Sequence, residues 1–408
     1  MSILDLVVLV VVLLQGLSGL RQGFAVGACS IAGSVLGAVA VVAVLPVVLP
    51  HLPGGDADHP LLRSLLGVVG VLAVAGIGRG VGAAVGHRIR VRRPGTLRTV
   101  DRVGGAGLSV VGTLLVLWAV GVVVAASALP VVPAAVRGSG VLTRVDGAVP
   151  TRARDWVQRL SRQVDGGTYP ALLQPFLSER IPAVAAPDGS VARSGVAARA
   201  ATATVKVTGS APACGTAVEG SGFVLDATHV VTNAHVVAGV TGPTVSLQGT
   251  TGASRGTRYR TEVVAFDPAL DVAVLAVVDG GRLAVTPLRL AAGRLDRGAP
   301  GVVLGYPGDG PLTASPARVR GSQTVQGTDI RGRGSVRREV YTLRTVVRPG
   351  NSGGPLVTAS GQVAGLVFAM SRDDPETGYA LTAAQIAPTV RAGAARDAGA
   401  PVPTGACA

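Results

Sequence analysis

The sequence is poor in charged residues for its length. Only 15% of its 408 residues are charged, 48% are hydrophobic, and the mean hydropathy is +0.49. An ordinary soluble protein is less apolar than this, because its surface must stay in water. The composition therefore predicts a membrane portion.

Lysine and aromatic residues are also scarce. Lys206 is the only lysine among 37 basic residues, and Phe, Trp and Tyr together make up 3% of the chain. The preference for arginine, alanine, glycine and valine is typical of a GC-rich genome, so the net charge of +14 is weak support for a nucleic-acid partner. Basic and aromatic residues are not interleaved as they are in nucleic-acid-binding surfaces. We expect no nucleic-acid partner, and neither a metal nor a cofactor.

Four apolar runs, each close to the ~20 residues that cross a bilayer as a helix, occupy the first third of the chain. They cover Ile3–Leu20, Phe24–Leu49, Leu61–Ile77 and Leu108–Pro130. A cleaved signal peptide would need a basic segment before the first run, and the chain instead has Asp5 at that end. The sequence predicts an α-helical four-span membrane domain.

Arginines are concentrated between the third and fourth runs. This loop holds Arg79, Arg88, Arg90, Arg92, Arg93, Arg98 and Arg102. Arginine-rich loops stay in the cytoplasm, so the fourth span leads out of the cell, and everything after about Pro130 is extracytoplasmic, on the periplasmic side. The runs carry no charge at mid-membrane depth that would indicate an ion path, which favours an anchor over a channel.

A single serine stands in a glycine-rich turn between two apolar segments, within Arg348–Leu356. Glycines allow a sharp turn, and they let backbone N–H groups, here those of Gly350 and Ser352, point to where an oxyanion would form. Such turns are common in a chain with 58 glycines, so the motif alone is only suggestive.

A histidine and an aspartate upstream give this serine a catalytic context. His235 follows a short apolar strand, and Asp271 stands at the head of the apolar run Val272–Val277, where it can accept a hydrogen bond from an imidazole. The order His, Asp, Ser is that of chymotrypsin-type proteases. The alternatives are His229, which precedes the apolar strand, and Asp267, which stands before a proline and fits a turn.

Four segments with these residues follow one another in the chain: Gly220–Val224, Thr232–Val237, Asp271–Leu275 and Gly350–Pro355. Together they resemble the trypsin-like proteases of the bacterial HtrA/Deg type. The resemblance implies a serine endopeptidase, a hydrolase with His235 as general base, Asp271 as its orienting partner and Ser352 as nucleophile. It also implies an oxyanion hole made by Gly350 and Ser352.

The rest of the chain fits an all-β protease domain. Short Val-, Leu- and Ala-rich runs alternate with turn residues from 201 to about 390, as expected of two packed antiparallel β-barrels. We predict a membrane domain at 1–132, an extracytoplasmic linker with short helices at 133–200 and a trypsin-like protease domain at 201–408. No PDZ-like segment follows the protease pattern, in contrast to the Deg proteases.

The membrane domain resembles the colicin V production (CvpA) family, through its four-span pattern and the segment Gly19–Phe24. A CvpA-like anchor joined to an extracytoplasmic trypsin-like domain, with arginine in place of lysine, resembles the actinobacterial membrane-anchored acid-resistance proteases. This resemblance implies proteolysis of cell-envelope proteins in the response to acid and oxidative stress. The alternatives are a transport or secretion factor, a catalytically silent scaffold and a chaperone-like binding module.

Specificity and oligomeric state are less constrained by the sequence. In the trypsin-like fold the base of the primary pocket lies several residues before the nucleophile, and Thr345, Val346 and Val347 offer no carboxylate there. We predict cleavage after an apolar side chain rather than after Arg or Lys. The sequence makes no prediction of oligomeric state.

The chain has three cysteines. Cys29 lies in the second apolar run, whereas Cys214 and Cys407 fall on the extracytoplasmic side, where disulfides persist. We predict a disulfide between Cys214 and Cys407, which would tie down a tail with little apolar surface and act as a redox switch. Two free thiols and an intermolecular bridge through Cys407 are the alternatives.

Overall fold

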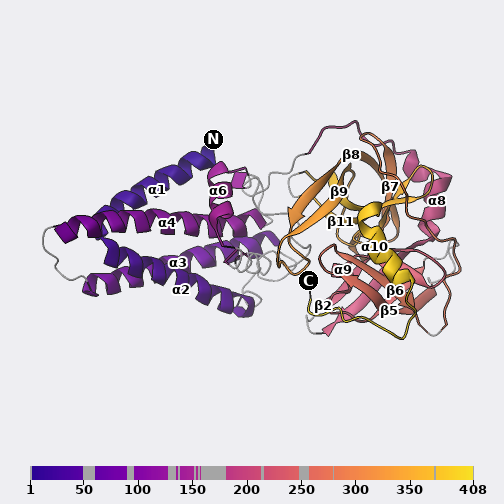
Figure 1. The fold of residues 1–408 in the computed structure, drawn as a ribbon, viewed down its shortest axis with the longest axis horizontal. Helices are drawn as coiled ribbons and strands as arrows, with labels where there is room; N and C mark the ends of the chain where they lie inside the picture. The colour runs from indigo at the N-terminus through magenta and orange to yellow at the C-terminus, as the bar shows by residue number, and fades with distance from the viewer. Residues whose placement is uncertain are drawn as a thin grey trace. The chain divides into compact units, whose positions relative to one another are not determined.

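The computed structural model of the chain describes residues 2–48, 60–89, 96–126, 135–136, 138–150, 153–154, 157, 181–212, 216–247, 257–278, 280–371 and 374–407. The chain divides into two compact units, Met1–Thr168 with Pro175–Ser178 and Tyr169–Gln174 with Glu179–Ala408. The first unit is helical, and the second is built mainly of β-strands (Figure 1). The predicted succession of helices and an all-β domain is confirmed.

Four long helices form the first unit, and Figure 1 shows them lengthwise beside one another. They are α1 (Ile3–Gln22), α2 (Phe24–Val48), α3 (Pro60–Ile89) and α4 (Thr96–Ala126). Within the described residues, Ile3–Gln22 and Thr99–Val122 are long and apolar enough to cross a membrane, and Phe24–Gly37 is a shorter apolar helix. Two of the four predicted spans thus meet the length and composition of a membrane helix in this part of the chain.

Glycines bring these helices into backbone contact in pairs. A Cβ placed on Gly33 of α2 would lie 2.1 Å from the Gly78 carbonyl oxygen of α3. One placed on Gly19 of α1 would lie 2.5 Å from the Gly105 carbonyl oxygen of α4. Only glycine fits such positions, which explains the close packing of α2 with α3 and of α1 with α4.

Two buried carboxylates hold the short helix α6 (Gly140–Ala148) on this unit. Asp5, at the start of α1, accepts hydrogen bonds from the Ser139 hydroxyl at 2.7 Å and from Val141 N at 3.2 Å. Asp146 accepts one from the Trp118 indole of α4 at 2.8 Å. Asp5 therefore links the start of α1 to the start of α6 rather than facing solvent.

The second unit contains two closed antiparallel barrels. The first has the strand order β1-β2-β3-β6-β5-β4 and the second the order β10-β11-β12-β9-β8-β7. The strands of the first barrel are β1 (Thr204–Ala211), β2 (Thr216–Val224), β3 (His229–Thr232), β4 (Thr241–Leu247), β5 (Thr257–Asp267) and β6 (Val272–Val277). Those of the second are β7 (Pro300–Gly305), β8 (Thr313–Gly327), β9 (Val336–Arg344), β10 (Pro355–Thr358), β11 (Val363–Met370) and β12 (Thr377–Thr382).

Short helices cover the barrels and connect them. The C-terminal helix α10 (Ala383–Ala394), drawn in yellow in Figure 1, contacts β5 and β6 of the first barrel and β11 and β12 of the second. Helix α8 (Gly195–Thr202) begins at the capping hydroxyl of Ser194 and buries Ala197 and Ala200 in the barrel core. The end of the predicted linker thus packs on the β-unit. The elements η2 (Val191–Arg193), α9 (Ala234–Val237) and η4 (Pro307–Asp309) complete it.

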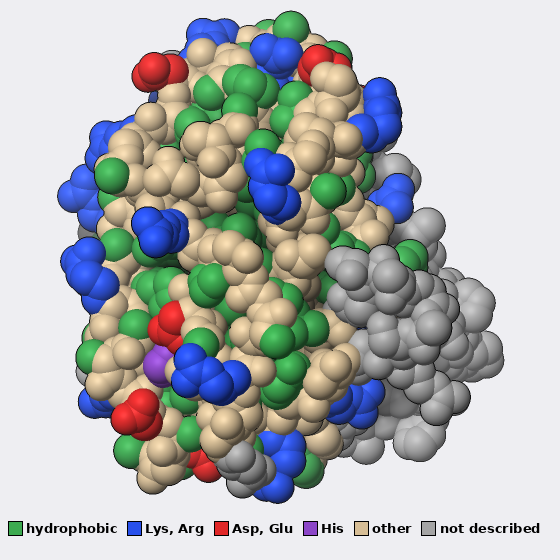
Figure 2. Space-filling view, turned by 90° about the vertical axis from the view of Figure 1, so that its right-hand side faces the viewer, with side chains coloured by type: hydrophobic (Ala, Val, Ile, Leu, Met, Phe, Trp, Pro, Cys, Tyr) green, Lys and Arg blue, Asp and Glu red, His purple; other side chains and the backbone are tan. Residues whose placement is uncertain are grey.

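The face of this unit drawn in Figure 2 carries more basic than acidic side chains, and no single basic cluster dominates it. Blue Lys and Arg side chains are spread over that face, between hydrophobic and uncharged polar surface, and red acidic side chains are fewer. This agrees with the excess of arginine in the sequence.

Candidate active site

The strand register brings His235 and Asp271 together. β3 pairs with β6 so that Thr232 lies opposite Ala273, which places the end of β3 beside the start of β6. His235 follows β3 in the single turn of α9, and Asp271 directly precedes β6. Nδ1 of His235 lies 2.8 Å from Oδ2 of Asp271, and the backbone N–H of His235 donates to Oδ1 at 2.9 Å. Asp271 is fully buried.

Asp271 has an unusual backbone conformation, which hydrogen bonds from nearby residues hold in place. Its φ of 64° lies in the left-handed region, which is costly for a residue with a side chain. Asn233 holds it by donating from Nδ2 to the Asp271 carbonyl oxygen at 2.7 Å. Asp267 forms the preceding turn, since its Oδ1 accepts hydrogen bonds from Ala269 N at 3.0 Å and Leu270 N at 2.9 Å. Asp267, the alternative considered from the sequence, thus serves the turn.

His229, the other alternative, is occupied elsewhere. Its Nδ1 lies 2.9 Å from the carboxylate of Asp226, and its Nε2 lies 2.8 Å from the carbonyl oxygen of Arg396. The residue is 4% exposed. With both ring nitrogens engaged, its imidazole has no nitrogen left for a substrate.

Ser352 lies in the turn between β9 and β10 of the second barrel, and this turn rests on the first barrel. The Ser352 carbonyl oxygen accepts a hydrogen bond from Ser221 N of β2 at 2.7 Å. A Cβ placed on Gly220 would lie 3.2 Å from that oxygen and 2.7 Å from the side chain of Val236, the residue after His235. The turn that carries Ser352 and helix α9, which carries His235, therefore meet at the same point of β2.

Two backbone N–H groups of this turn belong to peptides whose carbonyl oxygens are held by other residues. The carbonyl oxygen of Pro349 accepts a hydrogen bond from Gly308 N at 2.8 Å, and that of Asn351 accepts one from Gly354 N at 2.9 Å. In a trans peptide the N–H points away from the carbonyl, so the N–H groups of Gly350 and Ser352 point away from those donors. In the part of the chain that the structure describes, neither N–H has a hydrogen-bond acceptor.

Glycine is required at Gly350, where φ is +92°. A Cβ there would lie 2.2 Å from the carbonyl oxygen of Tyr306, at the turn that carries Gly308. The local sequence thus allows a conformation in which, among the described residues, the Gly350 N–H has no acceptor. This is the requirement of a site that stabilises a developing oxyanion.

Two groups near this site were not anticipated from the sequence. The sequence marks Ser221 only as part of a motif, although it stands between two glycines in the buried half of its strand. Arg338 of β9 is fully buried and donates to the Thr328 carbonyl oxygen at 2.8 Å. Among the described residues, its Nε and one terminal nitrogen have no hydrogen-bond partner. No local sequence signal marks it, because an arginine on a strand is ordinarily exposed.

The described residues also bear on the predicted cysteines and on metal binding. Cys214 lies outside the described residues, so its disulfide with Cys407 stays a prediction, and Cys29 is a free thiol. Within the described residues, no group of three or more His, Cys, Asp and Glu side chains is arranged to hold a metal ion.

Two known families match the two units. Residues 220–366, which include His235, Asp271 and Ser352, match the trypsin-like peptidase domain. Residues 4–150 match the colicin V production protein. The putative serine protease HhoA of Synechocystis is 32% identical over 167 residues, or 40% of each chain.

Relatives also match the chain over almost its whole length. The serine protease Rv3671c (MarP) of Mycobacterium tuberculosis is 38% identical over 413 residues, covering 99% of this chain and 98% of the relative. The crystal structure of the Rv3671c protease in its active form is 43% identical, with a TM-score of 0.52, and the match covers 58% of this chain and 99% of that chain. The chain therefore belongs to the family of serine proteases in which a colicin V production domain precedes a trypsin-like peptidase domain.

Proposed function

We propose that this membrane-associated serine endopeptidase cleaves proteins with His235 as general base, Asp271 as its orienting partner and Ser352 as nucleophile. The observation that carries the proposal is the double hydrogen bond between Asp271 and His235. The turn that carries Ser352 rests on β2, the strand that helix α9 with His235 also contacts. The N–H groups of Gly350 and Ser352 form the oxyanion hole.

The geometry supports the usual sequence of acyl transfer. Nε2 of His235 takes the hydroxyl proton of Ser352 while Oγ attacks the scissile carbonyl, whose π electrons move to its oxygen. The two N–H groups stabilise that oxyanion. Its collapse expels the amine, which receives the proton from Nε2, and leaves the acyl group on Ser352.

A water molecule completes the cycle. It gives a proton to His235 as its oxygen attacks the acyl carbon, and Ser352 Oγ leaves with that proton. Throughout, Asp271 keeps the Nδ1–H tautomer and stabilises the imidazolium, because its carboxylate lies 2.8 Å from Nδ1.

The test is covalent labelling of the full chain in detergent with a fluorophosphonate. Wild type should be labelled and Ser352→Ala should not. Ser360→Ala removes a hydroxyl from an exposed turn of the same unit and should label like wild type. Labelling of Ser352→Ala at the wild-type rate would refute the assignment.

We also propose that the first unit crosses the membrane four times and holds the protease unit outside the cytoplasm. Support comes from four helices of 20, 25, 30 and 31 residues and from the apolar side chains that α1 exposes, such as Leu13 and Leu14. The arginines between 79 and 102 add support, although the structure places Arg79 and Arg88 in α3 and Arg98 and Arg102 in α4 rather than in a loop. Alkaline phosphatase fused after residue 94 should be inactive, and fused after residue 150 it should be active. The reverse pattern would overturn this topology.

Cell-envelope proteins are the proposed substrates, and survival of acid and oxidative stress the proposed role, on the resemblance to acid-resistance proteases. A strain that lacks the gene should die faster in acid and be restored by wild type but not by Ser352→Ala.

Cleavage after an apolar residue is supported by Val346, which is 46% exposed beside the nucleophile turn. A peptide library cut mainly after Arg or Lys would overturn the specificity.

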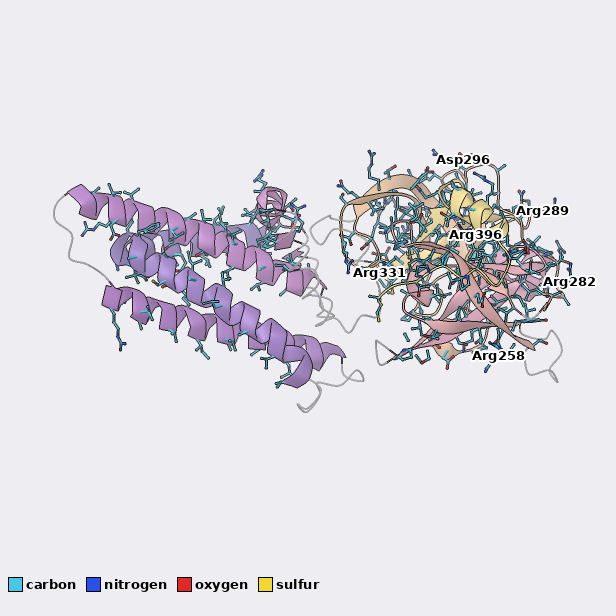
Figure 3. The ribbon with its side chains drawn as sticks, turned by 60° about the horizontal axis from the view of Figure 1, so that its bottom comes forward. Arg258, Arg282, Arg289, Asp296, Arg331 and Arg396 are labelled. Atoms are coloured by element: carbon cyan, nitrogen blue, oxygen red, sulfur yellow. The ribbon has the colours of Figure 1, made fainter. Side chains whose placement is uncertain are left out.

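The disulfide between Cys214 and Cys407 remains part of the proposal. The tail before Cys407 is already tied by hydrogen bonds: Val402 N donates to the Val263 carbonyl oxygen at 2.8 Å, and Arg331, labelled in Figure 3, donates to the carbonyl oxygens of Thr404 and Ala406. A disulfide there would join a segment that already lies on the protein. Non-reducing peptide mapping should find the linked pair, and alkylation of both thiols without reductant would exclude it.

A further inference from the structure

Ser221 makes a set of hydrogen bonds that no catalytic role explains. It lies on β2 of the first barrel and is fully buried. Its hydroxyl donates to the Gly350 carbonyl oxygen at 2.6 Å and accepts from Tyr306 N at 2.9 Å. Its backbone N donates to the Ser352 carbonyl oxygen at 2.7 Å. A single residue of the first barrel thus holds the nucleophile turn and the β7–η4 turn of the second.

These bonds restrain the two peptide planes on either side of the Gly350 Cα. The plane before it carries the Gly350 N–H, and Gly308 N holds the carbonyl of that plane, from Pro349, at 2.8 Å. The plane after it carries the Gly350 carbonyl, which the Ser221 hydroxyl holds at 2.6 Å. Because glycine has no Cβ to restrict φ and ψ, these contacts decide which way its N–H points.

The Ser221 hydroxyl takes part in both restraints. Tyr306, whose N–H it accepts, begins the turn that carries Gly308. Removing the hydroxyl would therefore release the Gly350 carbonyl and leave the buried Tyr306 N–H without an acceptor, which is costly. The Gly350 N–H could then rotate away from the substrate oxygen.

We infer that Ser221 is a positioning residue for the oxyanion hole, and that through it the docking of the two barrels sets the direction of the Gly350 N–H. This inference rests on the proposed function, since it assigns Gly350 to the oxyanion hole. Ser221 touches neither the substrate nor the reacting atoms, and it acts through the Gly350 peptide.

The test compares Ser221→Ala with Thr232→Val in the full chain in detergent. Thr232 is also buried, and its hydroxyl donates to the Ser221 carbonyl oxygen at 2.7 Å, so Thr232→Val removes one buried bond from the same neighbourhood without touching the Gly350 peptide. The measurements are the rate constant of fluorophosphonate labelling, kcat and KM for fluorescent casein, the pH profile of labelling, and Tm. Ser221→Thr, which keeps a hydroxyl, is the rescue variant.

We expect Ser221→Ala to lower the labelling rate and kcat about 10- to 100-fold, somewhat less than the loss of an oxyanion donor itself, with KM changed less than about twofold. The midpoint of its pH profile should not move, because His235 and Asp271 keep their contacts. Thr232→Val and Ser221→Thr should stay within about threefold of wild type in both rates.

Three results would overturn the inference: wild-type kcat in Ser221→Ala, an equal loss in Thr232→Val, or a folded Ser221→Thr as slow as Ser221→Ala. A Ser221→Ala chain without a cooperative unfolding transition would also count against it, because the hydroxyl would then serve the fold as a whole. Failure of the proposed function looks different, since wild type would then resist labelling or Ser352→Ala would accept it.

Discussion

Asp271 holds His235 at two points, with Oδ2 lying 2.8 Å from the imidazole Nδ1 and Oδ1 accepting the backbone N–H of the same residue at 2.9 Å. The ring is therefore oriented relative to its own backbone. Since Nδ1 faces the carboxylate, Nε2 is the nitrogen left to act as a base towards Ser352.

Asp271→Asn should abolish most activity without unfolding the chain. An amide at this position favours the wrong imidazole tautomer, and the expected loss of kcat for casein is about 10⁴-fold. Asp267→Asn is the matched control, because an asparagine oxygen can still accept the turn hydrogen bonds from Ala269 and Leu270. Equal losses of kcat in Asp271→Asn and Asp267→Asn would contradict the proposal that Asp271 orients His235.

Gly350→Ala should inactivate the enzyme, since its Cβ would lie 2.2 Å from the Tyr306 carbonyl oxygen at a φ of +92°. Gly361→Ala provides the comparison. Its φ is +85° and the nearest atom to its Cβ is a Val196 methyl at 3.6 Å, so it should lose about 1 kcal/mol of stability and keep its kcat. Casein hydrolysis and thermal unfolding measure both effects, and an active Gly350→Ala enzyme would contradict the oxyanion assignment.

Arg338→Met should shift the acid limb of kcat/KM to higher pH. Burial lowers the pKa of Arg338, while the nearby carboxylates of Asp271, Asp329 and Asp267 act in the opposite direction. A positive charge near Asp271 repels a second positive charge on the neighbouring imidazole, so removing the guanidinium should move the acid limb to higher pH. Arg337→Met, on the exposed side of the same strand, should leave the profile in place. A shift of the acid limb of Arg338→Met to lower pH would contradict this electrostatic effect of Arg338.

Asp374→Asn should destabilise the protease unit at neutral pH but not in acid. Burial raises the pKa of Asp374, yet hydrogen bonds from Glu376 N and Thr377, with the charges of Arg320 and Arg344, outweigh it and lower the pKa overall. A lowered pKa means that the carboxylate stabilises the fold above its unfolded value of about 4 and loses this effect as pH falls through the folded value.

The difference in Tm between wild type and Asp374→Asn should accordingly be largest near pH 7, shrink below about pH 4 and vanish at the acid end of the folded range. Asp296→Asn is the control, because Asp296 is exposed and its carboxylate makes no hydrogen bond within the described residues (Figure 3). A difference that persists unchanged down to pH 2 would exclude this titration.

Much of the architecture is local and could be predicted from the sequence. Apolar runs identify the helices at the start of the chain, because a helix that meets lipid must be apolar over most of its length. Short apolar segments broken by turn residues identify the β-unit. The packing of Gly195–Thr202 into the barrel core was not predicted, because alanines in a short helix look the same in a linker and in a core.

The sequence by itself determined the class of chemistry, since the motifs that contain His235, Asp271 and Ser352 together predict a serine endopeptidase. Only the tertiary structure decided how that chemistry is held. Asp271 meets His235 through the register of β3 and β6, and Ser221 meets Gly350 across 129 residues of chain and between two barrels. Contacts of this kind depend on how whole sheets dock, and a short stretch of sequence carries no signal for the direction in which a distant hydroxyl will point.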